Sequence, residues 1–142
     1  MPLTPAHITL VRHSFELVAP VAPQAAALFY DNLFEADPSL RRLFRGDMAH
    51  QGERLMTMLA TAVRMLDQPG TLLPVLRGLG ARHAGYGVTV DHYASVGRAL
   101  LKTLQNALEE AWTPGVAQAW VAVYTVISRT MQEGATTHPA AS

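Results

Sequence analysis

The chain has 142 residues, of which 49% are hydrophobic, enough to bury one substantial core but too few for two ordinary domains. Eleven Lys and Arg residues balance eleven Asp and Glu residues, and a formal net charge of zero argues against a nucleic-acid binder or a protein of anionic membrane surfaces. Without cysteine there are no disulfides, iron-sulfur clusters, thiolate zinc sites or cysteine nucleophiles, so a metal would need histidine, carboxylate or a cofactor.

The first residues do not resemble a targeting signal. Residues 1–5 lack the basic region followed by an apolar core that a signal peptide requires. The longest apolar run, residues 117–127, is too short to span a bilayer. We therefore expect a cytoplasmic protein without a membrane span.

The first half of the chain has the apolar spacing of helices. Thr4 is a cap signal for a helix from Pro5 to about Pro20, and a second helix is predicted from Ala22 to Glu35. Asp37-Pro38 ends that helix, and residues 38–44 are predicted to form a short helical turn. A long helix over about residues 51–66 follows.

The second half continues the same pattern. Thr71 is expected to cap the next helix, and residues 87–89 separate that helix from one over residues 93–108. The last helix opens at Thr113-Pro114 and is predicted to end at Gly134. No stretch alternates with period two long enough for a strand, so the fold class is all-α. We expect one domain over residues 1–134 and a disordered tail over residues 135–142.

His83 is the first candidate for chemistry. Leu72, Leu76 and Leu79 precede it by 11, 7 and 4 residues, which places the histidine on the apolar stripe of its helix, facing the interior. Such a histidine alone is commonly a hydrogen-bonded core residue. A second set, far upstream, has the residue types needed to enclose a ligand on an iron opposite His83: Tyr30, Phe44, Gln51 and Leu55.

Five segments in order carry a family resemblance. They are residues 28–34 (LFYDNLF), Asp37-Pro38 with Phe44 six residues later, residues 51–56 (QGERLM), residues 82–88 (RHAGYGV) and residues 92–97 (HYASVG). Over roughly residues 3–133 the chain resembles bacterial single-domain haemoglobins of the Vitreoscilla type and the globin domain of flavohaemoglobins. The resemblance implies a globin fold, a three-on-three helical sandwich enclosing haem b (iron protoporphyrin IX).

The resemblance also assigns roles. His83 would be the proximal iron ligand, and Phe44 would wedge against the haem, which is compatible with its being an ordinary core aromatic. Tyr30 and Gln51 would donate hydrogen bonds to bound oxygen, each worth on the order of 1.5–3 kcal/mol, or roughly ten- to hundredfold in release rate. Leu55 would cap the pocket. The alternatives are a buried Tyr30 bonded to a backbone carbonyl and an exposed helical Gln51.

Further haem contacts are implied around these residues. Tyr93 would help to orient His83, or would simply pack its helix. Arg54 and Arg82 are candidates for binding the haem carboxylates, and either could equally be a solvated surface charge. The remaining haem-binding residues implied by the resemblance are Leu79, Val88 and Val96.

Two features of the sequence bear on the chemistry of the iron. His50 adjoins Gln51 and is a possible second iron ligand, but one helical step rotates it by about 100°, toward solvent or a haem propionate. Flavohaemoglobins carry a glutamate eleven residues after the tyrosine that Tyr124 matches, whereas this chain has Ala135 there and Glu133 is out of register. A peroxidase-like iron is therefore disfavoured relative to oxygen binding.

The resulting functional hypothesis is reversible oxygen binding at a five-coordinate haem iron, for storage or transport, with nitric oxide and carbon monoxide as further ligands. The alternative is a nitric oxide dioxygenase, in which Tyr30 and Gln51 would be catalytic and a separate reductase would restore ferrous haem. A third hypothesis is a haem-free helical interaction domain. We expect a monomer or a weak homodimer that binds no nucleic acid.

Overall fold

The computed structural model describes residues 3–44 and 46–137. These residues form α-helices and short 3-10 helices and contain no strand, which confirms the all-α prediction. The α-helices are α1 (Pro5–Val18), α2 (Ala22–Ala36), α3 (Met48–Arg64), α4 (Pro69–Gly85), α5 (Val90–Leu108) and α6 (Pro114–Thr137). The 3-10 helices are η1 (Ala19–Val21), η2 (Pro38–Leu43) and η3 (Glu109–Ala111).

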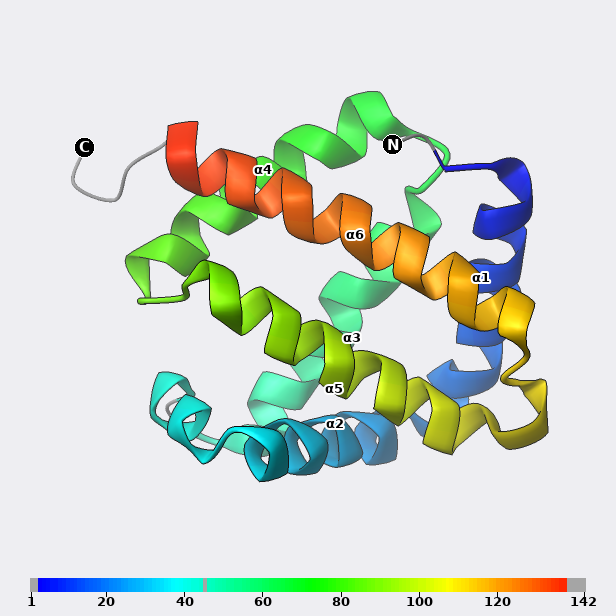
Figure 1. Cartoon of the computed structure of the whole chain (residues 1–142), viewed down its shortest axis with the longest axis horizontal. Helices are drawn as coiled ribbons and strands as arrows, with labels where there is room; N and C mark the ends of the chain where they lie inside the picture. Colours follow the sequence, from blue (N-terminus) through cyan, green and yellow to red (C-terminus); the bar gives the residue numbers. More distant parts are fainter. Residues whose placement is uncertain (1–2, 45, 138–142) are drawn as a thin grey trace.

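The helices form two layers (Figure 1). One layer contains α2, α5 and α6, with α5 packed against both of the others, and the second contains α1, α3 and α4. Contacts of α6 with α1 and α4, and of α2 with α3, join the layers. Since each helix has one apolar stripe, this stacking buries every stripe against a neighbour.

Two hydrophobic clusters fill the interior. The larger is centred on α1 and α6, where Trp120 is almost completely buried and donates its indole N–H to the Ser14 hydroxyl at 2.9 Å. The smaller lies around α2 and consists of Phe29, Tyr30, Leu33, Leu40 and Ala99 with partly buried neighbours.

The start of α4 differs from the prediction. The helix begins at Pro69 with Gln68 as its N-cap, so Thr71 lies within the first turn and does not cap it. Proline fixes φ near the helical value and has no N–H to satisfy, and it therefore starts the helix two residues before the threonine. Pro74 lies inside the same helix, where it removes one backbone hydrogen bond.

The end of α6 also differs from the prediction. Gly134 was expected to end the helix, but α6 continues to Thr137. A Cβ at Gly134 would overlap the backbone carbonyl of Arg77, so the glycine permits a close approach of α4 and is not a helix terminator. Of the predicted disordered tail, residues 135–137 are helical, and residues 138–142 lie outside the described residues.

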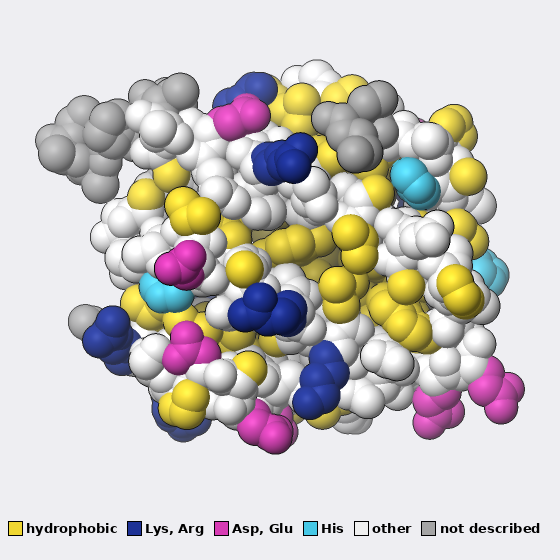
Figure 2. Space-filling view, in the orientation of Figure 1, with side chains coloured by type: hydrophobic (Ala, Val, Ile, Leu, Met, Phe, Trp, Pro, Cys, Tyr) yellow, Lys and Arg dark blue, Asp and Glu magenta, His cyan; other side chains and the backbone are white. Residues whose placement is uncertain are grey.

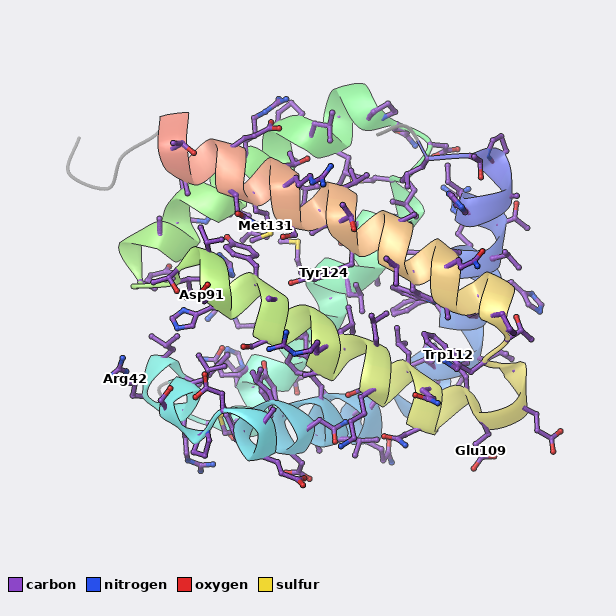
Figure 3. The ribbon with its side chains drawn as sticks, in the orientation of Figure 1. Arg42, Asp91, Glu109, Trp112, Tyr124 and Met131 are labelled. Atoms are coloured by element: carbon purple, nitrogen blue, oxygen red, sulfur yellow. The ribbon has the colours of Figure 1, made fainter. Side chains whose placement is uncertain are left out.

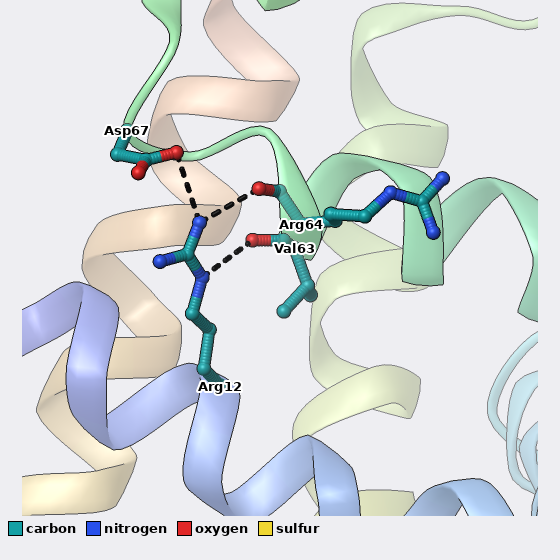
Figure 4. A network of polar contacts seen from close by, with 4 residues as sticks. All are labelled: Arg12, Val63, Arg64 and Asp67. Carbon is teal, nitrogen blue, oxygen red and sulfur yellow. Dashed lines mark hydrogen bonds and ion pairs between the residues drawn. The ribbon is translucent and has the colours of Figure 1, made fainter.

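Arg12 on α1 secures the end of α3 (Figure 4). Its guanidinium donates to the carbonyls of Val63 at 3.3 Å and Arg64 at 2.7 Å, and pairs with Asp67 at 2.9 Å. The last carbonyls of a helix have no partner within the helix, so the arginine satisfies two of them from a neighbouring element.

Charged side chains of both signs are interspersed on the face formed by α5 and α6, around a hollow lined by hydrophobic side chains (Figure 2). This mixture agrees with the balanced composition and shows no basic stripe on that face. Within the described residues, none of the helices combines the length and apolar character needed to cross a membrane.

Candidate functional site

The last turn of α4 presents His83 in a defined protonation state. Its Nδ1 lies 2.8 Å from the carbonyl oxygen of Leu79, one turn earlier. A carbonyl only accepts, so Nδ1 carries the proton. Burial lowers the pKa of His83, the Leu79 carbonyl opposes that shift, and the charge of Arg82 adds to it. The imidazole is therefore neutral near pH 7, and its Nε2 keeps a free lone pair.

Backbone hydrogen bonds close the helix just after this histidine. The His83 carbonyl accepts from the N–H groups of Tyr86 at 3.0 Å and Val88 at 3.1 Å. The Tyr86 ring lies 6.3 Å from the imidazole and is largely exposed. The turn thus holds the backbone of His83 while leaving one side of its surroundings open to solvent.

Tyr93, the predicted orienting residue, is buried on α5 in the same hydrophobic cluster as Leu79 and Val88. Its carbonyl accepts a 2.6 Å hydrogen bond from the Tyr124 hydroxyl, which points inward from α6 (Figure 3). Burial raises the pKa of Tyr124, so this phenol stays protonated. A Cβ at Gly97 would lie 2.6 Å from the Tyr124 ring, so the glycine makes room for this contact.

The sequence predicts no particular contact for Tyr124, because an aromatic side chain on an apolar stripe shows no preference for a particular partner carbonyl. The structure adds Tyr124 as the side chain that fixes the backbone of Tyr93.

The predicted distal residues come together in an aromatic cluster on the other side of the interior. The Tyr30 ring contacts those of Phe29, Phe34 and Phe44, with centroids 5.1, 5.9 and 5.2 Å away. Phe44 follows η2 directly, where the proline-started turn brings it back toward α2. Edge-to-face pairs such as Tyr30–Phe44 add to the stability that burial provides.

The Tyr30 hydroxyl donates to the backbone carbonyl of Gln51 at 3.3 Å. A tyrosine bonded to a backbone carbonyl was the alternative considered for this position, and the structure contains that bond. It is long for an O–H···O contact and thus weak. Burial raises the pKa of Tyr30 to about 12, so the phenol is a neutral donor across the physiological range.

Gln51 lies in the first turn of α3 and is half-buried, whereas its neighbour His50 is exposed. The side chain of Asp47 caps this turn through the Ala49 N–H at 2.9 Å. The exposure of His50 agrees with the helical-rotation argument that turned it away from the interior. Leu55, one turn after Gln51, packs in the Tyr30 cluster together with Phe44 and Val96.

The predicted apolar residues therefore divide between the two clusters. Leu79, Val88 and Tyr93 accompany the His83 helix, whereas Leu55 and Val96 pack around Tyr30 and Phe44. This division gives the site two sides, one carrying an imidazole and the other a phenol.

The charged candidates remain at the surface. Arg54 and Arg82 are both exposed, and one guanidinium nitrogen of Arg82 lies 3.8 Å from the position that a Cβ on Gly78 would take. Glu133 forms a 3.7 Å ion pair with Arg77, and Ala135 is partly buried. No group of three His, Cys, Asp or Glu side chains suited to a metal ion occurs within residues 3–44 and 46–137.

A family model described as Globin matches residues 27–131 of the chain. The flavohemoprotein of Chromobacterium violaceum is 35% identical over 107 residues, which are 72% of this chain and 26% of that protein. The neuroglobin of Danio rerio is 31% identical over 139 residues, which are 88% of this chain and 87% of that protein. The chain thus spans about a quarter of the length of the flavohemoprotein it matches.

Solved structures have the same fold. The crystal structure of a hexacoordinated haem protein from an anhydrobiotic tardigrade, determined at pH 4, has a TM-score of 0.86 at 19% identity. The match covers 95% of this chain and 96% of that one. At this level of identity the likeness concerns the fold alone, and it confirms the predicted globin fold.

Proposed function

Because the chain belongs to the globin family, we propose that it binds haem b through His83 and reversibly holds molecular oxygen beside Tyr30 and Gln51. The observation that carries this proposal is the hydrogen bond from His83 Nδ1 to the Leu79 carbonyl, which leaves Nε2 as a neutral lone-pair donor. A haem iron requires such a donor on one face.

The two sides of the site suit the two faces of a haem. When bound, ferrous haem supplies an iron that takes a diatomic gas such as oxygen, nitric oxide or carbon monoxide. Leu79, Val88 and Tyr93 would contact the His83 side, and Phe44, Leu55 and Val96 the Tyr30 side. Arg54 and Arg82 are exposed, as residues that bind the haem carboxylates would be.

Tyr30 is suited to act as a donor toward the gas. Its phenol is neutral and its 3.3 Å bond to the Gln51 carbonyl is weak, so the hydroxyl hydrogen can rotate to a better acceptor at small cost. In this proposal Gln51 adds an amide donor from the first turn of α3, and Leu55 limits the space above both. The exposed position of His50 supports a five-coordinate iron without a second histidine.

The test is a pair of histidine substitutions. We expect purified His83→Ala to lose the Soret absorption of bound haem or to hold haem far more weakly than the wild type. His92→Ala is the matched control, because His92 Nδ1 caps α5 by accepting from the Thr89 N–H at 2.9 Å and has no assigned contact with the haem in this proposal. Full haem retention in His83→Ala would contradict the assignment, and a wild-type chain that takes up no haem would support the haem-free interaction domain instead.

Nitric oxide dioxygenation is the second candidate, favoured by the 35% identity to a flavohemoprotein. In that reaction a haem held by His83 would supply the iron at which oxygen and nitric oxide combine to nitrate, Tyr30 and Gln51 would hold the oxygen, and a separate reductase would supply the one electron that each turnover requires. The discriminating measurement mixes the oxygenated protein with nitric oxide, supplies a reductase and counts nitrate per haem. One equivalent without further turnover would favour oxygen storage, whereas many equivalents would establish the enzyme.

A further inference from the structure

We propose that Gly80 and Gly134 are positioning residues for His83. Their lack of a side chain allows the backbones of α4 and α6 to come into contact where the helices cross, one turn before the histidine. This crossing determines the position of the imidazole. The inference rests on the proposed role of His83 as the iron ligand.

The crossing is reciprocal. A Cβ on Gly80 would overlap the backbone carbonyl of Met131 and lie 2.6 Å from its Cα. A Cβ on Gly134 would overlap the backbone carbonyl of Arg77 and also lie 2.6 Å from its Cα. Each helix thus contributes one glycine and, three residues before it, one carbonyl. Real Cβ contacts are never this short, so any larger residue must move one helix away from the other.

This contact is the main support of α4. Among the described residues, α4 shares an extended contact with α6 and with no other element (Figure 1). The inward-pointing Met131 marks the place on α6 where the crossing occurs (Figure 3). His83 follows Gly80 by three residues, so a shift at the crossing is transmitted directly to the imidazole. Misplacement by roughly 1 Å can change the chemistry of a site about a hundredfold.

Gly78 provides a control on the same helix. A Cβ there would meet only a guanidinium nitrogen of Arg82 at 3.8 Å, which is an ordinary contact with a flexible side chain. Glycine to alanine raises helix propensity equally at both positions. Gly78→Ala and Gly80→Ala therefore make the same chemical change in the same helix and differ in whether α6 obstructs it.

The experiment compares Gly78→Ala, Gly80→Ala and Gly134→Ala as haem-loaded proteins. The readouts are the iron–histidine stretching band of the ferrous protein and the rate of haem transfer to an acceptor apoprotein. We expect Gly78→Ala to match the wild type, while the other two shift the band and lose haem at least about tenfold faster. Agreement of all three variants with the wild type would overturn the proposal.

A second measurement separates positioning from general damage. In His83→Gly supplied with free imidazole, the iron base is no longer attached to α4, so adding Gly80→Ala should leave the iron–imidazole band unchanged. A band that still shifts shows that the substitution disturbs the pocket in general, and it refutes the proposal. Failure of both Gly80→Ala and Gly134→Ala to fold, with Gly78→Ala intact, would also refute it in favour of a purely structural contact. A wild-type chain without haem would instead overturn the proposed function and this inference with it.

Discussion

Single hydrogen bonds decide what the two functional side chains can do. The Leu79 carbonyl assigns the proton of His83 to Nδ1, and burial keeps the ring neutral. Burial likewise keeps the Tyr30 phenol protonated, and its hydroxyl donates only a long hydrogen bond, to the backbone carbonyl of Gln51 at 3.3 Å. Each residue therefore suits its proposed role, the histidine as a base toward a metal and the tyrosine as a donor toward a ligand.

Replacing Tyr30 by phenylalanine tests the second of these tasks. We expect Tyr30→Phe to retain haem but to release oxygen at least about tenfold faster, since a donor to a partly anionic ligand contributes on the order of 1.5–3 kcal/mol. Stopped-flow displacement of oxygen by carbon monoxide measures the rate. Tyr86→Phe is the control, because Tyr86 is 68% exposed and lies outside the aromatic cluster. An unchanged release rate in Tyr30→Phe would contradict the assignment of Tyr30 as a hydrogen-bond donor to bound oxygen.

The raised pKa of Tyr30 predicts how oxygen release depends on pH. The folded-state pKa is about 12, above the value of 10.0 for a free tyrosine, so the folded protein holds this proton more tightly than the unfolded chain. We expect a constant release rate from about pH 7 to pH 9, and faster release only as the pH approaches 12. The corresponding contribution to stability is complete below about pH 10 and is lost as the pH rises to 12.

Release rates measured at several alkaline pH values in the wild type and in Tyr30→Phe check this dependence. The wild-type rate should rise toward that of the variant at high pH. A wild-type rate that rises already between pH 7 and pH 9 would show that another group controls release.

At the scale of the helices, α4 differs from the others in that, among the described residues, its one extended contact is with α6. It contains Pro74 and the glycines Gly78 and Gly80, each of which lowers the intrinsic stability of a helix, and it packs mainly on α6. By contrast α6 contacts α1 and α4 of the other layer as well as α5 of its own, and it buries Trp120. The stability of α4, which carries the proposed iron ligand, thus depends on its contact with α6 and on the group that binds His83.

Hydrogen exchange should reveal this difference. In the apo protein we expect the amides of residues 72–86 to exchange fastest among the helical amides, and to slow at least about tenfold when haem is added, because binding to the native state adds to its stability. Amides around Trp120 serve as the internal reference and should stay protected in both forms. Equal protection of α4 with and without haem would contradict the prediction.

The helix boundaries show which helix ends can be predicted from neighbouring residues alone. Thr4 and Pro5 start α1 as predicted, because a side-chain cap and a first-turn proline act within a few residues. The predictions for Thr71 and Gly134 were wrong. Pro69 starts α4 before the threonine is reached, and Gly134 serves a contact with a residue 57 positions earlier in the chain, at Arg77.

At the scale of the molecule, α1 is joined to α3 by more than apolar packing. Arg12 donates to two carbonyls at the end of α3 and also forms an ion pair with Asp67. The Asp67 side chain is 55% exposed and that of Arg12 37%, so solvent weakens the ion pair itself. We expect the carbonyl bonds to contribute more to stability than the ion pair, since the last carbonyls of a helix lack their usual partners; besides the arginine, the Val63 carbonyl accepts a long 3.4 Å bond from the Leu66 N–H.

Two alanine substitutions separate these contributions. We expect Arg12→Ala to lower the free energy of unfolding by about 1–2 kcal/mol, because it removes both carbonyl bonds. Asp67→Ala should lower it by less than about 1 kcal/mol, because it removes only the exposed pair. Urea unfolding of both variants provides the measurement. Equal losses would show that the ion pair carries the whole effect.

From the sequence alone follow the all-α class of the fold, which the structure confirms, and the candidate residues of the site, which stay a prediction. Apolar periodicity is a local property with a period of 3.6 residues, so it identified the helices and placed His83, Leu55 and Tyr93 on inward faces. The segments around Tyr30, Gln51 and His83, in that order along the chain, predicted the globin family, and the family model confirms it.

Which groups meet depends on how the helices pack. The Tyr30 hydroxyl bonds to a carbonyl 21 residues away, the Tyr124 hydroxyl to one 31 residues away, and Gly80 packs on the backbone of Met131. Backbone carbonyls occur in every residue, so no pattern of side chains specifies which carbonyl a distant phenol or glycine will reach. That choice is made when the two helical layers pack, and it sets the helix crossing on which the proposed position of His83 depends.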